Sequence, residues 1–372
     1  MSKRIVKLDV IRIIALFGCI AVHFLLNCGF YSETVEGKRM LLMCMYRTIF
    51  ILCVPMFLTL TGYLKNKEKI SKNYFKKLYK VLAIYLICSI IYAIFTKFYL
   101  KEKMNFSIFL QNLLSYKGTD YAWYIEMYIG LFLIIPFLNL IFNNLKTEKE
   151  YQMLLIILFI MIGLNGILNI YRFDNIEWWM QPSSNLKYNK IVPDYWITIY
   201  PIFYYFLGVY LSKFKLKIRK SENVLMIILI VLLFGIFDYY RSFNSRYIWG
   251  PWNYYNSGII MILTVLVFNL LLSINIKESK ITNEILKYMS NACLGAYLIS
   301  CMFDKIYYKK LNSLIPNVKD RFVFAPILVV LSFISSIILS MLINIIYNYI
   351  EKIIKGIKNK KNKLLEERKV EK

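Results

Sequence analysis

LMIILIVLLFGIF, residues 225–237, is apolar on every face and decides the fold class. A surface helix of a soluble domain carries one apolar stripe, whereas a helix that is hydrophobic all round is buried or surrounded by lipid. Lipid offers no water to backbone N–H and C=O groups, so such a segment must satisfy them internally, as an α-helix does. The strands of a membrane barrel would alternate apolar and polar residues instead. The stretch therefore predicts an all-α membrane protein.

Other blocks of the same kind extend along the chain. Its 372 residues are 59% hydrophobic with a mean hydropathy of +0.52, whereas soluble domains are roughly 45–50% apolar. Each block approaches or exceeds the ~20 residues that cross a bilayer. One domain over residues 1–350 is thus expected to form a polytopic transmembrane bundle of about ten helices. The predicted helices are 10–30, 40–64, 78–100, 121–145, 151–171, 196–212, 223–240, 254–276, 286–303 and 323–350.

The net charge of +25 indicates how the chain is oriented in the membrane rather than nucleic-acid binding, because the charge lies in short loops between apolar blocks. Cytoplasmic loops of membrane proteins are enriched in Lys and Arg. Both termini are therefore predicted to be cytoplasmic. The basic tail, 351–372, is expected to lie on anionic membrane lipid. The composition also favours a multi-pass protein of a bacterial plasma membrane. Most of the 47 Lys and Arg residues lie in segments 1–9, 65–80, 146–150, 213–222, 277–287 and 351–372.

The remaining loops leave two interpretations open. Segments 172–195 and 241–253 are rich in Trp, Tyr and Asn. Such rings serve as interfacial anchors, and beside amide and charged groups they also suit sugar recognition. Segment 104–117 is too short to span and is predicted to be an interfacial helix. The seven cysteines show no metal-ligand spacing, so we expect reduced thiols and no metal.

Ionisable residues inside a membrane span are costly and therefore mark candidate sites. His23 is the only histidine, hence the one imidazole available for proton transfer near neutral pH. Arg12 precedes it by 11 residues, about three helical turns and about 16 Å, within about 20° of the same face. Asp9, one turn before Arg12, either orients the guanidinium or forms an ion pair at the membrane boundary. A lone histidine in a helix is more often a packing residue, but the position of Arg12 on the same face favours a functional role for His23.

Arg47 and Glu126 are predicted to lie at a depth similar to that of His23. A buried arginine needs a carboxylate or an anionic ligand, so one interpretation is a structural ion pair between the two. In the other, Glu126 orients the imidazole and Arg47 stabilises negative charge on the reacting group. Both interpretations are open.

The loop 65–80 carries seven lysines. It is either a topology signal or a binding site for the phosphates of a cytosolic donor. Lys77 and Lys80 begin the third predicted helix, beside the mouth that Arg12 marks. The chain has neither a P-loop nor a GxGxxG motif.

An ordered set of segments resembles the integral-membrane acyltransferase-3 family. The first contains the Arg-x10-His pair of Arg12 and His23, and the second ends in a Gly-Tyr element. The set covers almost the whole chain. It consists of KLDVIRIIALFGCIAVHF (7–24), VPMFLTLTGYL (54–64), YFKKLYKVLAIY (74–85), AWYIEMYIGLFLIIPFL (122–138), FYYFLGVYL (203–211) and LGAYLIS (294–300).

The resemblance implies transfer of an acyl group, usually acetyl from cytosolic acetyl-CoA, to a hydroxyl of a cell-envelope glycan or lipid-linked sugar. It implies that Arg12 and His23 are the essential pair. Three positions depart from the family pattern. Thr61 replaces a serine, Ala83 and Ile84 replace prolines, and Ser300 stands where a late histidine is common.

The expectation is thus an acyl-CoA-dependent O-acyltransferase with His23, Arg12, Glu126 and Arg47 as catalytic residues. Arg12, Lys77 and Lys80 are expected to bind acetyl-CoA. His23 acts either as general base or as transient acyl carrier. Two other classes remain open, a transporter or flippase for a glycan or lipid-linked intermediate and an inactive membrane assembly module. A homo-oligomer is compatible with each.

Overall fold

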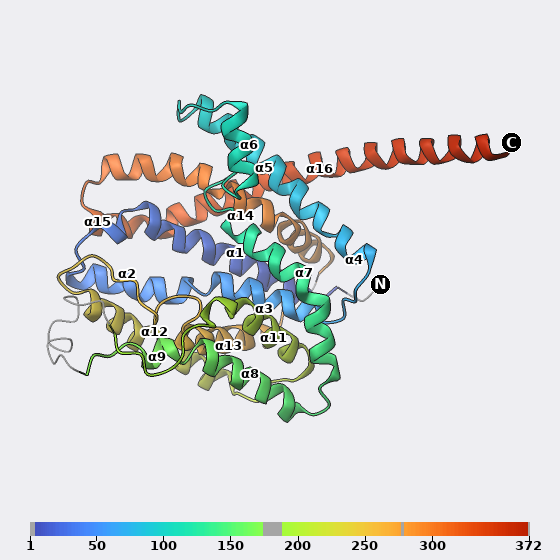
Figure 1. The fold of residues 1–372 in the computed structure, drawn as a ribbon. Coiled ribbons are helices and arrows are strands. Elements are labelled where there is room, and N and C mark those ends of the chain that lie inside the picture. The colour runs from blue at the N-terminus through green and yellow to red at the C-terminus, as the bar shows by residue number, and fades with distance from the viewer. Residues whose placement is uncertain (1–3, 174–187, 277–278, 371–372) are drawn as a thin grey trace.

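The computed structural model describes residues 4–173, 188–276 and 279–370, and within these ranges it is helical without a β-strand (Figure 1). The prediction of an all-α protein is confirmed. The helices are α1 Val6–Asn27, α2 Gly37–Phe50, α3 Cys53–Lys65, α4 Lys72–Lys76, α5 Leu78–Phe98, α6 Phe106–Leu114, α7 Trp123–Asn144, α8 Glu148–Ile162, α9 Asn165–Leu168, α11 Tyr200–Lys213, α12 Lys220–Ser242, α13 Gly258–Leu272, α14 Lys280–Leu314, α15 Val318–Arg321 and α16 Ala325–Val370.

Within the described ranges, six helical segments are long and apolar enough to cross a membrane, and α13 is a shorter apolar helix. A helix occupies each of the ten predicted ranges. Ten crossings and a cytoplasmic location of the termini stay predictions, although the N-terminal end of the chain and the end of α16 lie at the same end of the bundle (Figure 1). The six segments are Val6–Asn27, Gly37–Lys65, Lys72–Phe98, Trp123–Asn144, Lys220–Ser242 and Val318–Gly356.

Several predicted boundaries differ from the observed ones. The range 40–64 is divided into α2 and α3, and the range 151–171 into α8 and the short α9. The range 286–303 is only the middle of the 35-residue α14. Its apolar run ends at residue 303, but the helix continues because its next turns still pack inward, with Tyr308 and Leu311 buried. The basic tail is likewise no separate element, since α16 runs to residue 370.

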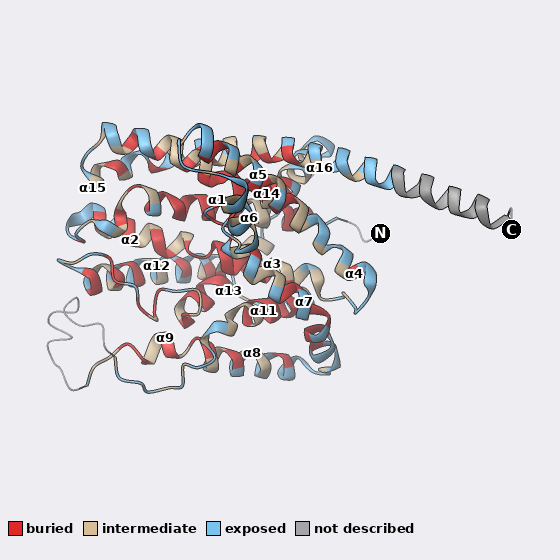
Figure 2. Ribbon diagram, turned by 45° about the horizontal axis from the view of Figure 1, so that its top comes forward, coloured by how far each residue is buried: buried red, intermediate tan, exposed pale blue. Residues whose placement is uncertain are grey.

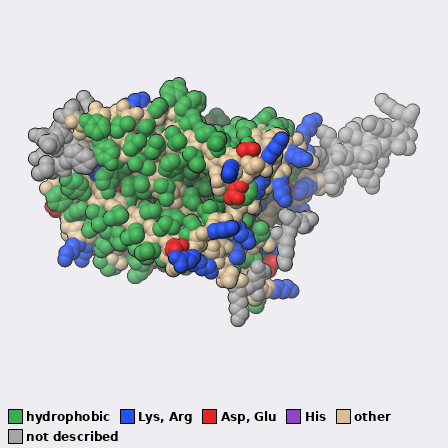
Figure 3. All heavy atoms as spheres, turned by 90° about the horizontal axis from the view of Figure 1, so that it is seen from below, with side chains coloured by type: hydrophobic (Ala, Val, Ile, Leu, Met, Phe, Trp, Pro, Cys, Tyr) green, Lys and Arg blue, Asp and Glu red, His purple; other side chains and the backbone are tan. Residues whose placement is uncertain are grey.

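Helix α1 lies at the centre of the bundle and packs against α2, α3, α14 and α16 (Figure 1). Its residues are mostly buried, whereas the outer helices alternate buried and exposed faces (Figure 2). The exposed faces carry large apolar side chains, and Figure 3 shows one side of the molecule covered by them. Lipid must be the solvent of such a surface, because a soluble protein rarely exposes an apolar patch of this extent.

Helices α3 and α11 approach each other closely at two glycines. A Cβ atom added at Gly62 would lie 1.9 Å from the carbonyl oxygen of Tyr205, and one added at Gly208 would lie 1.8 Å from that of Thr59. Small residues allow this close backbone contact between membrane helices. The contact accounts for the glycines of the LTGYL and FLGVYL segments, and it fixes the wall of the site described next.

Candidate active site

Two cavities adjoin along one face of α1. The Arg12 cavity has a volume of about 340 Å³ and the His23 cavity about 540 Å³. Three residues, Cys19, Val54 and Tyr297, line both. Arg12 and His23 are about 16 Å apart along the helix axis, so the shared residues lie between them. The helix face that Arg12 and His23 share therefore lines two adjoining cavities.

The Arg12 cavity gathers cationic side chains from three helices. Arg12 donates from Nη1 to the Ser290 hydroxyl at 2.8 Å. Lys77 and Lys80 line the same cavity, so the structure brings together the three residues expected to hold the donor. Lys65, at the end of α3, is a fourth cation that the sequence analysis did not single out. Lys65 is one of the seven lysines of segment 65–80, and nothing in the sequence separates it from the other six.

Asp9 does not orient Arg12. Its carboxylate accepts from Nε of Arg4 at 2.6 Å. The expectation of an Asp9–Arg12 pair is therefore corrected. The Arg12 guanidinium instead faces the neutral hydroxyl of Ser290. A neutral partner does not balance its charge, so the Arg12 cavity favours an anionic ligand.

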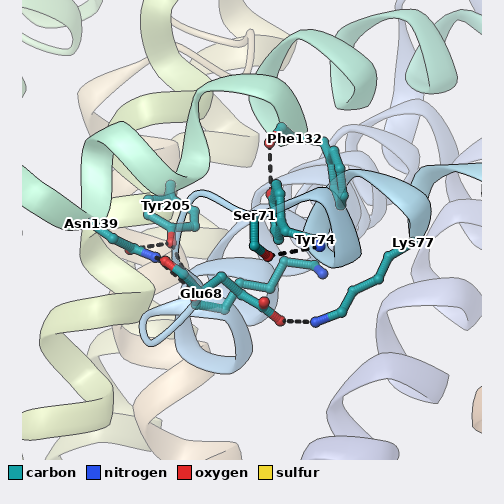
Figure 4. A network of polar contacts seen from close by, with 8 residues as sticks. Glu68, Ser71, Tyr74, Lys77, Phe132, Asn139 and Tyr205 are labelled. Carbon is teal, nitrogen blue, oxygen red and sulfur yellow. Dashed lines mark hydrogen bonds and ion pairs between the residues drawn. The ribbon is translucent and has the colours of Figure 1, made fainter.

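The rim of the Arg12 cavity is fixed by a polar network (Figure 4). Lys77 forms an ion pair with Glu68 at 2.6 Å. The ammonium group of Lys65 lies over the Phe132 ring, 5.2 Å from its centroid. Asn139 donates to the carbonyl oxygens of Lys65 and Glu68 at 2.8 and 2.9 Å. The loop between α3 and α4 is thus tied to α7.

His23 lines the other cavity and is 7% exposed. Its ring stacks on that of Tyr121, with centroids 3.7 Å apart. Its Nδ1 atom is buried and has no hydrogen-bond partner within the described ranges. Among the described residues, no carboxylate is hydrogen-bonded to this nitrogen, and the imidazole instead packs on an aromatic ring.

Tyr121 is held in turn by α1 and α14. Its hydroxyl donates to Asp304 Oδ2 at 2.8 Å and accepts from Asn27 at 3.1 Å. Asp304 is 1% exposed and also accepts from Ser332 at 2.8 Å. The sequence analysis missed Tyr121 and Asp304. Asp304 directly follows the apolar run of the ninth predicted helix, and a longer helix would have placed it inside the bundle.

Glu126 is exposed and lines neither cavity. Its neighbour Tyr124 lines the Arg12 cavity, and two residues correspond to about 200° around a helix. The expected contacts of Glu126 with His23 and with Arg47 are therefore corrected. Asp304 is the carboxylate linked to the imidazole, through Tyr121.

Arg47 is buried, at 1% exposure, but it lines neither cavity. It donates from Nε to the Tyr31 hydroxyl at 3.1 Å and from both Nη atoms to the Asn253 carbonyl at 3.2 Å. Its guanidinium lies over Trp249, 4.5 Å from the ring centroid. Arg47 therefore supports a wall of the His23 cavity, and the predicted direct contact with a reacting group is corrected.

Aromatic side chains dominate the His23 cavity. Tyr31 stacks on Trp249 with centroids 4.8 Å apart, and Trp123 stacks on Tyr255 at 6.0 Å. Burial raises the pKa of the Tyr31 and Tyr255 phenols, so both stay neutral hydrogen-bond donors. Of the two aromatic loops, 241–253 thus contributes Trp249 to a cavity. Residues 174–187 of the other loop lie outside the described residues.

Ser300 supplies no substitute for a second imidazole. It is fully buried, and its hydroxyl donates to the Tyr297 carbonyl of its own helix at 2.9 Å. His23 is the only histidine of the chain. Any imidazole chemistry therefore depends on His23 alone. Within the described ranges, no group of His, Cys, Asp and Glu side chains has the arrangement of a metal site.

Comparisons with known proteins identify the family of the chain. The family model described as an acyltransferase domain, acyltransferase-3, matches residues 5–344. Curated relatives from Staphylococcus aureus strains MSSA476, MRSA252 and MW2 are each named probable poly-beta-1,6-N-acetyl-D-glucosamine export protein. Each is 25% identical over 274 residues, which cover 68% of this chain and 72% of the relative. No solved structure matches the chain significantly. Because the family match spans nearly the whole sequence, the chain is a multi-pass membrane protein that belongs to the acyltransferase-3 family.

Proposed function

We propose that this protein is a membrane O-acyltransferase. It moves an acyl group, acetyl according to the family resemblance, from cytosolic acyl-CoA to a hydroxyl of a cell-surface glycan or lipid-linked sugar. The observation that carries the proposal is the junction of the two cavities. A cationic cavity with Arg12 and an aromatic cavity with His23 share Cys19, Val54 and Tyr297. Donor and acceptor can meet there inside the membrane.

The Arg12 cavity suits the donor. Arg12, Lys65, Lys77 and Lys80 would bind the phosphates of CoA, and charge-assisted hydrogen bonds to phosphate are among the stronger ones in proteins. Glu68 forms an ion pair with Lys77. A phosphate would compete with that carboxylate. The thioester end would then lie toward Cys19 and Tyr297, beside His23.

In the His23 cavity, the imidazole takes the proton of the acceptor hydroxyl. The acceptor oxygen attacks the thioester carbonyl, the C–S bond breaks, and the CoA thiolate leaves and receives that proton. In the alternative mechanism, a His23 ring nitrogen attacks the thioester carbonyl, the C–S bond breaks, and the CoA thiolate leaves with the imidazole proton. The acceptor hydroxyl then attacks the acyl-imidazole, the C–N bond breaks, and the hydroxyl proton returns to the His23 ring. Positioned acid–base catalysis contributes about 10²–10⁴-fold. The ring contact with Tyr121 supplies the positioning.

The proposal is tested with the full chain in lipid nanodiscs and radiolabelled acetyl-CoA. We expect release of CoA that depends on a glycan acceptor, and loss of this activity in His23→Ala. Ser300→Ala is the matched control, because Ser300 lines neither cavity and its hydroxyl donates to a carbonyl of its own helix. Normal transfer by a well-folded His23→Ala protein would overturn the mechanism.

A second candidate is export of a glycan, which the names of the staphylococcal relatives favour. Two adjoining cavities would also suit a translocation path. An exporter would move a labelled oligosaccharide across proteoliposomes without acyl-CoA and without releasing CoA. Acceptor-dependent CoA release distinguishes the transferase. If neither activity is found and replacing both Arg12 and His23 leaves cells normal, the chain is an assembly module.

A further inference from the structure

We propose that the His23 cavity binds an uncharged pyranose unit of the acceptor, placed against the ring pair formed by Tyr31 and Trp249. The inference rests on the proposed acyl transfer and names the chemical class of its acceptor. The two claims fail separately, because sugar binding can be measured without any acyl donor.

The cavity has flat apolar walls. Tyr31 and Trp249 stack with an angle of 24° between their planes, and Trp123 and Tyr255 stack at 18°. All four rings line the same cavity. A pyranose presents a face of C–H groups that packs on such rings, while its hydroxyls point to the side. The volume of about 540 Å³ lies within the range of roughly 300–1,000 Å³ of small-molecule sites.

The Tyr31–Trp249 pair is fixed from outside the cavity. Arg47 donates to the Tyr31 hydroxyl, and its guanidinium lies over the Trp249 ring. The same guanidinium is anchored on the Asn253 carbonyl. A cation buried behind two rings costs desolvation energy. The buried Arg47 guanidinium fixes the Tyr31 and Trp249 side chains before a ligand binds. Less side-chain entropy is then lost on binding.

Polar groups at the cavity suit hydroxyls rather than anions. Asp120 and Asn256 line it, and none of the described lining residues is Lys or Arg. Asp120 accepts from the Tyr92 hydroxyl at 2.7 Å and pairs with Lys305 at 3.0 Å, so the cation nearest to this carboxylate is already engaged. A sugar carboxylate or phosphate would meet the exposed Asp120 carboxylate with no Lys or Arg among the described lining residues to offset its charge, and like charges repel. Neutral hydroxyls would donate to the same carboxylate.

The test is saturation-transfer NMR on the full chain in nanodiscs, with no donor present. The probes are a neutral N-acetylglucosamine tetrasaccharide and a galacturonate tetrasaccharide, which is anionic. We expect transfer from protein to the ring protons of the neutral sugar and little transfer to the anionic one. Equal or tighter binding of the galacturonate would overturn the inference.

Variants identify the wall that binds. Trp249→Ala should weaken binding of the neutral sugar about tenfold or more, because the stacking surface is lost. Trp249→Phe should keep most of the affinity, which separates lost stacking from misfolding. Trp196→Ala is the matched control, since Trp196 is half-exposed and lines neither cavity. Unchanged affinity in a folded Trp249→Ala protein would also overturn the inference.

The transferase claim has its own readout. If the neutral sugar binds through Trp249 but no CoA is released with any acceptor, the sugar site stands and the acyl transfer fails. If CoA is released only with the anionic acceptor, the acyl transfer stands and the proposed acceptor class fails.

Discussion

The imidazole of His23 lies against the ring of Tyr121, with centroids 3.7 Å apart and planes inclined by 27°. The Tyr121 hydroxyl donates to Asp304 at 2.8 Å. The candidate base on α1 is thus linked to a buried carboxylate on α14 through a ring contact rather than through a direct hydrogen bond. This differs from a catalytic triad, in which the carboxylate accepts from the imidazole itself. In the proposed mechanism, Tyr121 and Asp304 are therefore positioning residues for His23.

Tyr121→Phe keeps the stacked ring but removes its hydrogen bonds to Asp304 and Asn27. We expect kcat to fall about tenfold with little change in KM for acyl-CoA, because the ring loses its anchor while the donor cavity is unaltered. The buried Asp304 carboxylate would lose one hydrogen-bond partner and keep Ser332, which should also lower the free energy of unfolding by about 1–3 kcal/mol. Steady-state kinetics and thermal unfolding in nanodiscs measure both. Tyr99→Phe is the control, on an exposed ring. An unchanged kcat would remove Tyr121 from the proposed machinery.

Two carboxylates give opposite expectations. Asp304→Asn alters the carboxylate that accepts from Tyr121 and should reduce kcat. Glu126→Gln changes an exposed side chain outside both cavities, so kcat should stay within about twofold of its original value. The comparison is made by measuring the release of CoA from acetyl-CoA at a saturating donor concentration. A large loss in Glu126→Gln together with normal activity in Asp304→Asn would reverse the assignment made from the structure.

Arg12→Ala and Lys77→Gln should raise KM for acyl-CoA by about tenfold or more each, because a hydrogen bond to a charged group is worth about 1.5–3 kcal/mol. The effect should shrink at high salt, where exposed charges are screened, and should be absent with a pantetheine thioester that lacks the nucleotide phosphates. Lys149→Gln is the matched control, since Lys149 is exposed and lines neither cavity. Equal losses with CoA and pantetheine donors would argue against phosphate binding.

Arg47→Lys keeps the charge but loses the planar fork that reaches Tyr31 and Asn253. We expect KM for the glycan acceptor to rise several-fold, while KM for acyl-CoA stays the same, because Arg47 supports only the wall of the His23 cavity. Separate titrations of donor and acceptor measure the split. A rise confined to the donor would contradict the position of Arg47 in the fold.

Gly62→Ala and Gly208→Ala should destabilise the protein, because each new Cβ would overlap a backbone carbonyl of the facing helix. Such overpacking typically costs about 1–3 kcal/mol or more. Gly130→Ala is the control, since nothing lies within 4 Å of a Cβ built there. Alanine in that helix should be neutral or stabilise by about 0.5–1 kcal/mol. The measurement is the thermal unfolding temperature of the three variants. Equal temperatures for all three would contradict the close contact of α3 with α11.

The placement of Arg12, Lys77 and Lys80 was predictable, because local helical spacing and the position of a basic loop at a helix start require no tertiary information. The placement of Glu126 and Arg47 could not be predicted from the sequence. Residues at equal predicted depth can face any direction around their helices, and the rotation of each helix follows from packing. Two residues of α7 illustrate this, since Tyr124 lines a cavity and Glu126 is exposed.

The sequence by itself determined that the protein is helical and membrane-spanning, because backbone hydrogen bonding in lipid leaves long apolar segments no other solution. It also determined that Arg12 and His23 share one face of the first helix, since that relation is local. Only the tertiary structure decided that this face joins a cationic cavity to an aromatic one. The contact of His23 with Tyr121, and of Tyr121 with Asp304, joins three helices or helix ends far apart in sequence. Such contacts depend on how helices rotate and pack against one another, which no local pattern records.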